Sequence, residues 1–195
     1  MSGGSITAVI LAGGRSRRMN GEDKGLLDLK GKPLVQHVID RIAPQADNII
    51  ISANRNQARY EKFGYAVVSD EQQNYLGPLA GIAAAMQQSA TDYLLVVPCD
   101  TPFLPNDLAT TLRQRLEQER VRVCLAHDGH RLQPLIVLLA CSLRSRLDTA
   151  IAADHLKVET WMLAQKHCIA RFSDPDRFMN INSRDELARA ETQAY

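Results

Sequence analysis

The sequence predicts a three-layer α/β fold, in which helices cover both faces of a mostly parallel sheet. Short aliphatic runs alternate along the chain with segments whose apolar residues recur at helical spacing. The runs are apolar throughout, which is typical of strands that are buried on both faces. The chain has 195 residues and is 45% hydrophobic, so we expect one domain over 1–195, with a disordered start at 1–5.

In the first half of the chain, the strand-like runs are short and end near glycine, proline or polar residues. They cover 6–10, 26–30, 48–52, 65–68 and 93–97, and the last is the most hydrophobic strand of the chain. Pro33 suits the first turn of a helix that continues to about Ala43, because its φ angle is already helical there. Further helices are expected over 57–63 and from Gly77-Pro78 onward.

In the second half, Asn106 or Asp107 can cap a helix that runs to about Glu119. Strands over 121–126 and 134–140 follow, separated by the turn-like Asp128-Gly129. Helices are expected over 142–153 and 159–166, and a strand over 168–172. Ser183 with Glu186 three residues later forms a capping box, which predicts the start of a last helix.

The composition excludes several classes of function. The net charge of +1 gives no global case for binding nucleic acid or an anionic membrane. Two histidines in an HDGH turn, His127 and His130, have no further Cys or His ligands nearby, which favours a solvated turn over zinc. No apolar run is long enough to span a bilayer and 1–5 lacks a secretory signal, so a cytoplasmic protein is expected. We expect the scattered cysteines to be reduced structural thiols: Cys99, Cys124, Cys141 and Cys168.

The chain is organised around residues 11–24, with the sequence LAGGRSRRMNGEDK. Gly13-Gly14 follow a buried strand, and glycine lets the backbone approach a ligand closely. The loop also carries four cations, Arg15, Arg17, Arg18 and Lys24, so a site for a multiply charged anion is predicted. Neither a Walker A loop nor a GxGxxG fingerprint is present. A plain strand-end turn with a solvated basic face is the alternative.

Five motifs together resemble one family of nucleotidyltransferases. The LAGG, SRRM and DK elements of the first loop are joined by GKPL at 31–34, GPLAG at 77–81, PCDTPFLP at 98–105 and NINSRDEL at 180–187. In this order they resemble the molybdenum cofactor guanylyltransferases over nearly the entire chain. The resemblance implies a Rossmann-like fold of the nucleotide-diphospho-sugar transferase type.

The resemblance also implies roles for individual residues. Catalytic roles would fall on Lys24, Arg18 and Asp100, and Asp100 would hold Mg²⁺. Asn180 and Asn182 are the candidates for the pterin side, with turn residues as the alternative. The positions expected to contact GTP are Leu11, Ala12, Gly13, Gly14, Lys24, Ser52, Asp70 and Asp100.

Physical arguments support some of these roles more than others. Asp100 directly follows the most hydrophobic strand, and Mg²⁺ prefers a few carboxylate oxygens together with phosphate oxygens and water. Its structural alternative is a turn cap. Asp70 also follows a strand and could equally be a turn residue. Ser52 departs from the asparagine that the family has there, and nearby Asn54 or a water could replace the contact.

The implied reaction is transfer of GMP from GTP to the molybdenum-molybdopterin cofactor, which releases diphosphate and forms the guanine dinucleotide. The implied partners are GTP and molybdenum-molybdopterin, and transient contacts with cofactor biosynthesis proteins and molybdoenzyme chaperones are compatible with it. A cytidylyltransferase that uses CTP would share the first loop. A non-catalytic nucleotide-binding regulator would share it too, but would have no use for Asp100.

Overall fold

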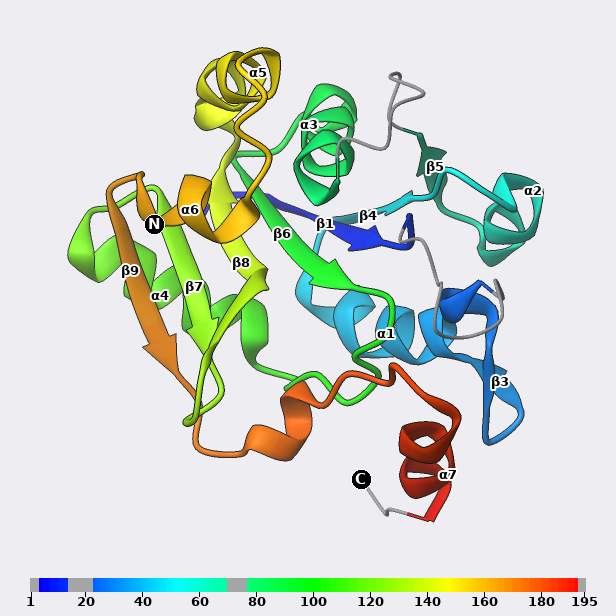
Figure 1. Cartoon of the computed structure of the whole chain (residues 1–195). Coiled ribbons are helices and arrows are strands. Elements are labelled where there is room, and N and C mark those ends of the chain that lie inside the picture. The colour runs from blue at the N-terminus through cyan, green and yellow to red at the C-terminus, as the bar shows by residue number, and fades with distance from the viewer. Residues whose placement is uncertain (1–3, 14–22, 70–76, 193–195) are drawn as a thin grey trace.

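The computed structural model describes residues 4–13, 23–69 and 77–192, and its centre is one seven-stranded sheet (Figure 1). The strand order is β5-β4-β1-β6-β8-β7-β9. β8 is antiparallel to both of its neighbours, while the other pairings of this sheet are parallel. The strands are β1 Ile6–Leu11, β4 Asn48–Ser52, β5 Ala66–Val68, β6 Tyr93–Pro98, β7 Val123–His127, β8 Leu132–Ala140 and β9 His167–Arg171.

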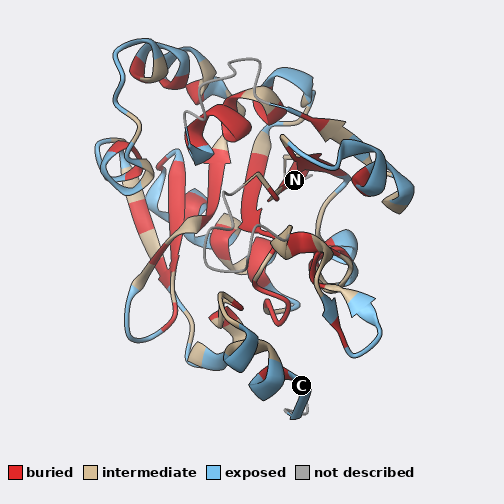
Figure 2. Cartoon of the chain, turned by 45° about the vertical axis from the view of Figure 1, so that its right-hand side comes forward, coloured by how far each residue is buried: buried red, intermediate tan, exposed pale blue. Residues whose placement is uncertain are grey.

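Helices cover both faces of this sheet, as the sequence predicts. α1 (Leu34–Ile42) and α4 (Leu108–Glu119) pack on one face. α3 (Pro78–Gln88), α5 (Arg144–Ala152) and α6 (Val158–Leu163) pack on the other. Side chains of β1 alternate between the two layers, since Ala8 and Ile10 join the first cluster and Val9 joins the second. Figure 2 shows the central strands buried between these layers, so the three-layer prediction is confirmed.

The strand order reverses at β1. The chain builds outward from β1 through β4 and β5, and then crosses to β6 on the other side of β1. In register, Leu11 at the end of β1 pairs with Ser52 of β4 and with Pro98 of β6. The segments that follow these three strands therefore leave the sheet at one place, where open α/β sheets bind their ligands.

The segment 26–30 contains a shorter strand than the sequence predicts, although the chain turns at Gly31 as expected. A 3₁₀ turn spans Lys24–Leu26, and β2 (Asp28–Leu29) then pairs with β3 (Lys32–Pro33) in a separate hairpin. Lys30 and Gly31 have φ angles of 54° and 80°, so the two residues between the strands make a tight turn. The Asp28 side chain accepts a hydrogen bond from the Gly31 amide at 2.8 Å, which stabilises that turn.

The helix-capping predictions have mixed outcomes. Asp107 occupies the N-cap position of α4, but its side chain makes no capping hydrogen bond. Asn106 instead accepts a hydrogen bond from Arg41. At α7 (Arg184–Thr192), Ser183 Oγ accepts from the Glu186 amide at 3.2 Å, as the capping box predicts. The α6 helix ends at Leu163 rather than at residue 166.

A small third cluster carries the C-terminal helix. Ala190 and the partly buried Leu187 of α7 pack with Leu29 of the β2–β3 hairpin, and with Phe103 and Ile181. In Figure 1 the helix lies beside this hairpin, away from the main sheet. The cluster thereby connects three segments that are distant in sequence: the one after Lys24, the one after Asp100 and the one around Asn182.

The remaining elements are short. α2 (Gln57–Tyr60) continues into a 3₁₀ turn at Glu61–Phe63, and further 3₁₀ turns span Ala43–Gln45, Cys141–Leu143 and Pro175–Phe178. Ser5, in the segment expected to be disordered, donates its amide to the Asp92 carboxylate at 2.9 Å. Within the described ranges, no helix is both long and apolar enough to cross a membrane.

Candidate functional site

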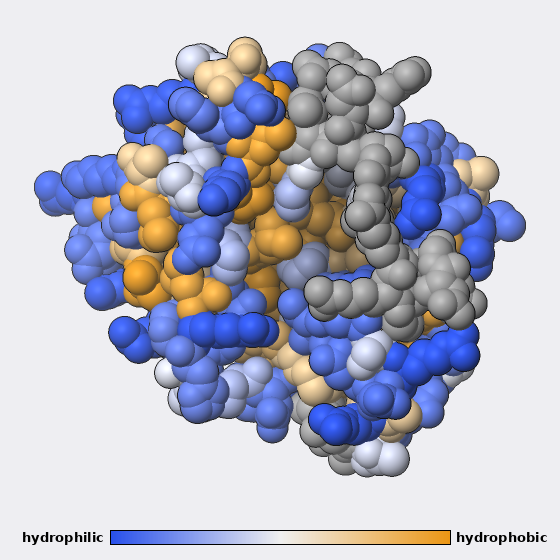
Figure 3. Space-filling model, viewed as in Figure 1, coloured by the Kyte–Doolittle hydropathy of each residue, from blue (hydrophilic) through white to orange (hydrophobic). Residues whose placement is uncertain are grey.

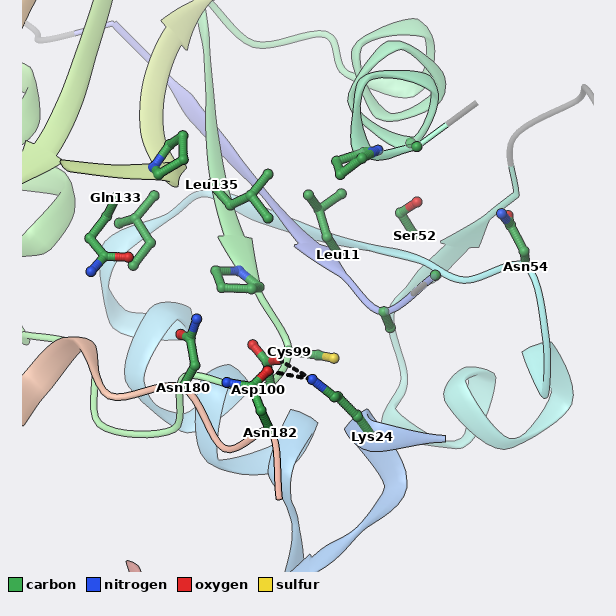
Figure 4. A pocket seen from close by; sticks show the side chains of 18 of the residues that line it. Leu11, Lys24, Ser52, Asn54, Cys99, Asp100, Gln133, Leu135, Asn180 and Asn182 are labelled. Atoms are coloured by element: carbon green, nitrogen blue, oxygen red, sulfur yellow. Dashed lines mark hydrogen bonds and ion pairs between the residues drawn. The ribbon is translucent and has the colours of Figure 1, made fainter. Parts of the chain in front are cut away.

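A pocket of about 760 Å³ opens at the carboxyl ends of β1, β4 and β6. The space-filling view shows apolar residues gathered in the central hollow of this face, with hydrophilic side chains around it (Figure 3). One part of the wall, the β1 arm, consists of Leu11, Ala12, Gly13, Ser52, Asn54, Gly77, Pro78 and Gly81. A second part, the β8 arm, consists of residues 131–136 and Asn180. Lys24, Pro98, Cys99, Asp100 and Asn182 line the pocket between the arms (Figure 4).

At the junction of the two arms, the Lys24 side chain points toward Asp100 and Asn182 (Figure 4). Its Nζ is 3.2 Å from Asp100 Oδ2 and donates to Asn182 Oδ1 at 2.6 Å. The side chains of Lys24 and Asp100 are only 23% and 14% exposed, so water screens this ion pair less than a surface pair. The fold thus brings together three of the predicted site residues from segments that are far apart in sequence.

Asp100 has the features of a cation ligand. Its Oδ2 faces Lys24, whereas its Oδ1 is buried and has no hydrogen-bond partner among the described residues. A buried carboxylate oxygen without a partner is costly, and a cation would satisfy it. The described residues contain no group of three or more Asp, Glu, His or Cys that could hold a metal.

Backbone and side-chain bonds hold the segment at 180–182 against the end of β6. The Ile181 amide donates to the Asp100 carbonyl at 2.8 Å, and the Thr101 hydroxyl donates to Asn180 Oδ1 at 2.6 Å. The Glu186 carboxylate accepts from the Asn182 amide at 2.6 Å. Asn180 therefore contacts Thr101, and Asn182 contacts Lys24, so neither asparagine is remote from the residues expected to act on the nucleotide.

Small residues and backbone form much of the β1 arm. The Ala12 amide donates to the Ser52 carbonyl at 2.8 Å, which continues the pairing of β1 with β4 beyond the last strand residue. A Cβ at Gly81 would lie 2.5 Å from Ser52 Oγ, so glycine lets α3 approach β4 closely here. A Cβ at Gly13 would meet only Asn54 and Ser52 atoms at 3.6 Å or more, which is ordinary contact.

The β8 arm was missed by the sequence prediction, apart from Asn180. The buried Asp128 carboxylate organises its start: it accepts from the amides of His130 and Arg131 at 2.7 Å and from Gln133 Nε2 at 2.6 Å. Burial alone would raise the pKa of Asp128, but these hydrogen bonds outweigh it and the pKa is lowered. The turn is a hydrogen-bonded hairpin, as expected from HDGH, and it places Arg131 and Gln133 at the pocket.

Cys99 lies beside Asp100 in the pocket wall. Burial and the neighbouring Asp100 charge raise the pKa of its thiol well above the ordinary value, so it is a neutral, weak nucleophile. The four cysteines are free and three of them are buried. Five of the residues predicted for the site lie outside the described residues: Gly14, Arg15, Arg17, Arg18 and Asp70.

A mostly parallel sheet with a pocket at its switch point, a partly buried carboxylate and an adjacent lysine is the architecture of an α/β nucleotide-binding enzyme. A family model described as "MobA-like NTP transferase domain" matches residues 8–168. The chain belongs to this family, and the resemblance noted from its motifs is confirmed.

Curated relatives and solved structures agree with this assignment. A "Molybdenum cofactor guanylyltransferase" of Shewanella putrefaciens is 47% identical over 182 residues, with 93% of each chain covered. The protein of the same name from Shewanella sediminis is 48% identical, also with 93% of each chain covered. A solved molybdopterin-guanine dinucleotide biosynthesis protein A from Archaeoglobus fulgidus is 24% identical, with a TM-score of 0.77 and coverage of 95% and 96%.

The fold extends to enzymes with other names. The solved 4-diphosphocytidyl-2C-methyl-D-erythritol synthase from Anaerococcus prevotii has a TM-score of 0.78 at 11% identity, with 97% of this chain and 95% of that one covered. At such identities the two solved structures show the fold alone, and the predicted nucleotidyltransferase fold is confirmed.

Proposed function

We propose that this chain transfers GMP from GTP to the terminal phosphate of the molybdenum-molybdopterin cofactor. An oxygen of that phosphate attacks the α-phosphorus of GTP, the bond from the α-phosphorus to the bridging oxygen breaks, and diphosphate leaves. The observation that carries the proposal is the Lys24–Asp100 pair at the junction of the two pocket arms. It provides a cation and a cation ligand where a triphosphate and an acceptor phosphate would meet.

The β1 arm suits the nucleotide. It lies at the switch point of the sheet, and its small residues leave room for a ligand to approach the backbone at 11–13. Lys24 would face the triphosphate from the junction. Since phosphoryl-type transfer depends mainly on positioning and on neutralising charge, no covalent enzyme intermediate is needed.

Asp100 is the residue that would hold Mg²⁺ in this proposal. When bound, the ion would neutralise charge on the triphosphate oxygens. The Oδ1 of Asp100 is buried and has no hydrogen-bond partner among the described residues, which supports this role. It also disfavours a purely regulatory protein, which would gain nothing from this oxygen.

The β8 arm and the segment at 180–182 suit the acceptor. Arg131 can attract a phosphate monoester, while Gln133 and Asn180 add amide groups next to aliphatic wall residues such as Leu135. The sequence prediction for Asn180 and Asn182 thus stays a proposal for the pterin side. The hydrogen bond from Lys24 to Asn182 makes Asn182 a residue shared by both halves of the site.

The choice of base rests on the relatives. The fold is common to proteins named for cytidyl and for guanine products, so it leaves CTP open. The curated relatives at 46–48% identity are named guanylyltransferases, which favours GTP. A cytoplasmic location is part of the proposal, because GTP is available there and the free cysteines suit a reducing compartment.

A transfer assay tests the proposal. Purified protein is mixed with Mg²⁺, molybdenum-molybdopterin and GTP labelled at the α-phosphate, with CTP in a parallel reaction. Label should move from GTP into a dinucleotide in step with diphosphate release, and much less from CTP. Equal transfer from CTP would replace the guanine assignment, and absence of transfer from either nucleotide would contradict the enzymatic function.

A further inference from the structure

Next to Lys24 in the sequence, Asp23 belongs to a second polar cluster, whose residues do not line the pocket. The Asp23 carboxylate accepts from Tyr60 Oη at 2.5 Å through one oxygen and from Asn56 Nδ2 at 2.9 Å through the other. Tyr60 and Asn56 belong to α2 and the residue before it, which follow β4. Asp23 precedes the 3₁₀ turn but does not cap it with its side chain. Instead, the Asp23 carboxylate connects this turn to α2 through these two hydrogen bonds.

The backbone beyond Asp23 is confined as well. Gly25 is buried, and a Cβ there would lie 2.5 Å from Tyr60 Oη and 3.3 Å from Cys99 Sγ. The Leu26 amide donates to the Asp23 carbonyl at 3.0 Å. The residues on either side of Lys24 are therefore fixed against Tyr60, one by a hydrogen bond and one by close packing.

Tyr60 is suited to be the fixed point. Its side chain is fully buried in the main core cluster, with its ring 6.3 Å from that of Phe63. Burial, followed by the nearby Cys99 and the bond to Asp23, raises the pKa of the phenol far above its ordinary value. The hydroxyl therefore stays protonated and remains a donor to Asp23 over the working pH range.

We propose that Tyr60 and Asn56 are positioning residues, which hold Asp23 so that Lys24 reaches Asp100 and Asn182 from a fixed backbone. The consequence for catalysis rests on the proposed function. Lysine has a long flexible side chain, so its ammonium group is well placed only if its backbone is fixed. We call Asp23, Tyr60 and Asn56 the lysine clamp. None of the three lines the pocket itself.

Two variants loosen the clamp in different ways. Tyr60→Phe removes only the hydroxyl and leaves the ring in the core. Asn56→Gly removes the exposed amide, and glycine accepts the left-handed backbone of residue 56, where φ is 54°. Because Asn56 is exposed, this second variant folds even if the buried change proves too destabilising. Tyr65→Phe is the matched control: Tyr65 packs on the same core cluster, and its hydroxyl makes no hydrogen bond to another described residue.

The first measurement needs no ligand. In protein labelled with ¹³C at lysine Cε, the Lys24 signal is identified by its loss in Lys24→Ala. It should move toward the signals of exposed lysines in Tyr60→Phe and in Asn56→Gly, and stay in place in Tyr65→Phe. A Lys24 signal that is unchanged in both clamp variants overturns the proposal.

The second measurement is single-turnover GMP transfer. Displacing a reacting group by about 1 Å can cost on the order of a hundredfold in rate, so a loosened clamp should lower the rate about tenfold. The dissociation constant for GTP should change less than the rate. In the Lys24→Ala background, Tyr60→Phe should cause no further loss, because the clamp acts only through Lys24. Losses that multiply in the double variant contradict the proposal and indicate a general structural role.

The two proposals fail in different ways. If the wild-type protein does not transfer GMP, the proposed function is wrong, and the Lys24 signal alone decides whether the clamp positions this residue. If the wild type transfers GMP and the clamp variants do so at the wild-type rate, the clamp proposal is wrong and the proposed function stands.

Discussion

The two arms of the pocket are built by different means. The β1 arm consists mainly of small residues and backbone directly after β1 and at the start of α3, with Gly13, Gly77 and Gly81 among them. The β8 arm consists of side chains, and its start is held by the buried Asp128 carboxylate. The shape of the β1 arm thus depends on small residues that leave the backbone open. The shape of the β8 arm depends on a charged carboxylate and its hydrogen bonds.

This difference matches the separate roles proposed for the two arms, with the nucleotide in the β1 arm and the acceptor in the β8 arm. Backbone and glycine give a surface of fixed shape, which suits a nucleotide that presents the same groups in every reaction. Side chains such as Arg131 and Gln133 can distinguish one acceptor from another. We expect substitutions in the β1 arm to alter nucleotide binding, and those in the β8 arm to alter use of the acceptor. Substitutions at the junction should damage the reaction itself.

The largest effect is expected at the junction, from Asp100→Asn. The substitution preserves size but removes the charge that faces Lys24 and would attract Mg²⁺. Loss of one electrostatic stabiliser commonly costs a hundredfold or more in turnover, equivalent to about 3 kcal/mol of barrier. Turnover is measured at several Mg²⁺ concentrations, and excess Mg²⁺ should recover part of the loss. A folded variant with unaltered turnover would show that the metal is held elsewhere, and Asp70 would be tested next.

A smaller effect, specific to the β1 arm, is expected from Gly13→Ala. The added methyl group meets only ordinary contacts in the ligand-free fold, at 3.6 Å or more, so the melting temperature should stay almost unchanged. If the nucleotide approaches this backbone, the methyl group blocks it, and the dissociation constant for GTP should rise about tenfold, or about 1.4 kcal/mol. Calorimetric titration with GTP measures the constant. An unaltered constant would place the nucleotide away from Gly13.

A substitution in the β8 arm should weaken use of the acceptor and leave GTP binding unchanged. Arg131→Ala removes a side chain that is 68% exposed and only loosely paired with Asp128, at 3.7 Å, so the fold should tolerate it. We expect the KM for molybdenum-molybdopterin to rise about fivefold, since one exposed charge contact contributes about 1 kcal/mol. The dissociation constant for GTP should not change. A rise in that constant instead would mean that the triphosphate extends into the β8 arm.

The sequence could predict most of the β1 arm and Asp100, but not the β8 arm. Leu11, Ala12, Gly13 and Ser52 are at or directly after strands that the sequence predicts, and glycines mark the turn. Asp100 follows the most hydrophobic strand. Their place in the pocket follows from a general rule about parallel sheets, so local signals suffice.

The β8 arm and the lysine clamp depend on pairings that local sequence does not reveal. β8 is antiparallel next to β6, although the strand between them in sequence, β7, lies one position further out. The HDGH turn correctly indicated a hairpin, but the edge to which it points depends on this order. Likewise, Tyr60 reads as an ordinary aromatic residue of a short helix until the fold brings Asp23 to its hydroxyl.

The last prediction concerns stability rather than turnover, namely how pH affects the stability of the β8 arm. The pKa of Asp128 is lowered in the folded protein, since hydrogen bonds outweigh the effect of burial. A lowered folded-state pKa contributes stability that is fully present above the unfolded value of about 3.9 and is lost as pH falls through the folded value. Asp128→Asn keeps an acceptor but loses the charge, so it should lower the free energy of unfolding by about 1–2 kcal/mol near neutral pH. Denaturant unfolding of wild type and variant is repeated from neutral pH toward acid. The difference in their free energies of unfolding should shrink as the wild-type carboxylate becomes protonated.

Gly81→Ala is the control in the β1 arm, which has no such carboxylate among its described residues. The substitution forces a Cβ toward Ser52, so it should destabilise the protein by an amount that does not change with pH. If the loss of unfolding free energy in Asp128→Asn were equally independent of pH, the β8 arm would be stabilised by packing rather than by the Asp128 charge.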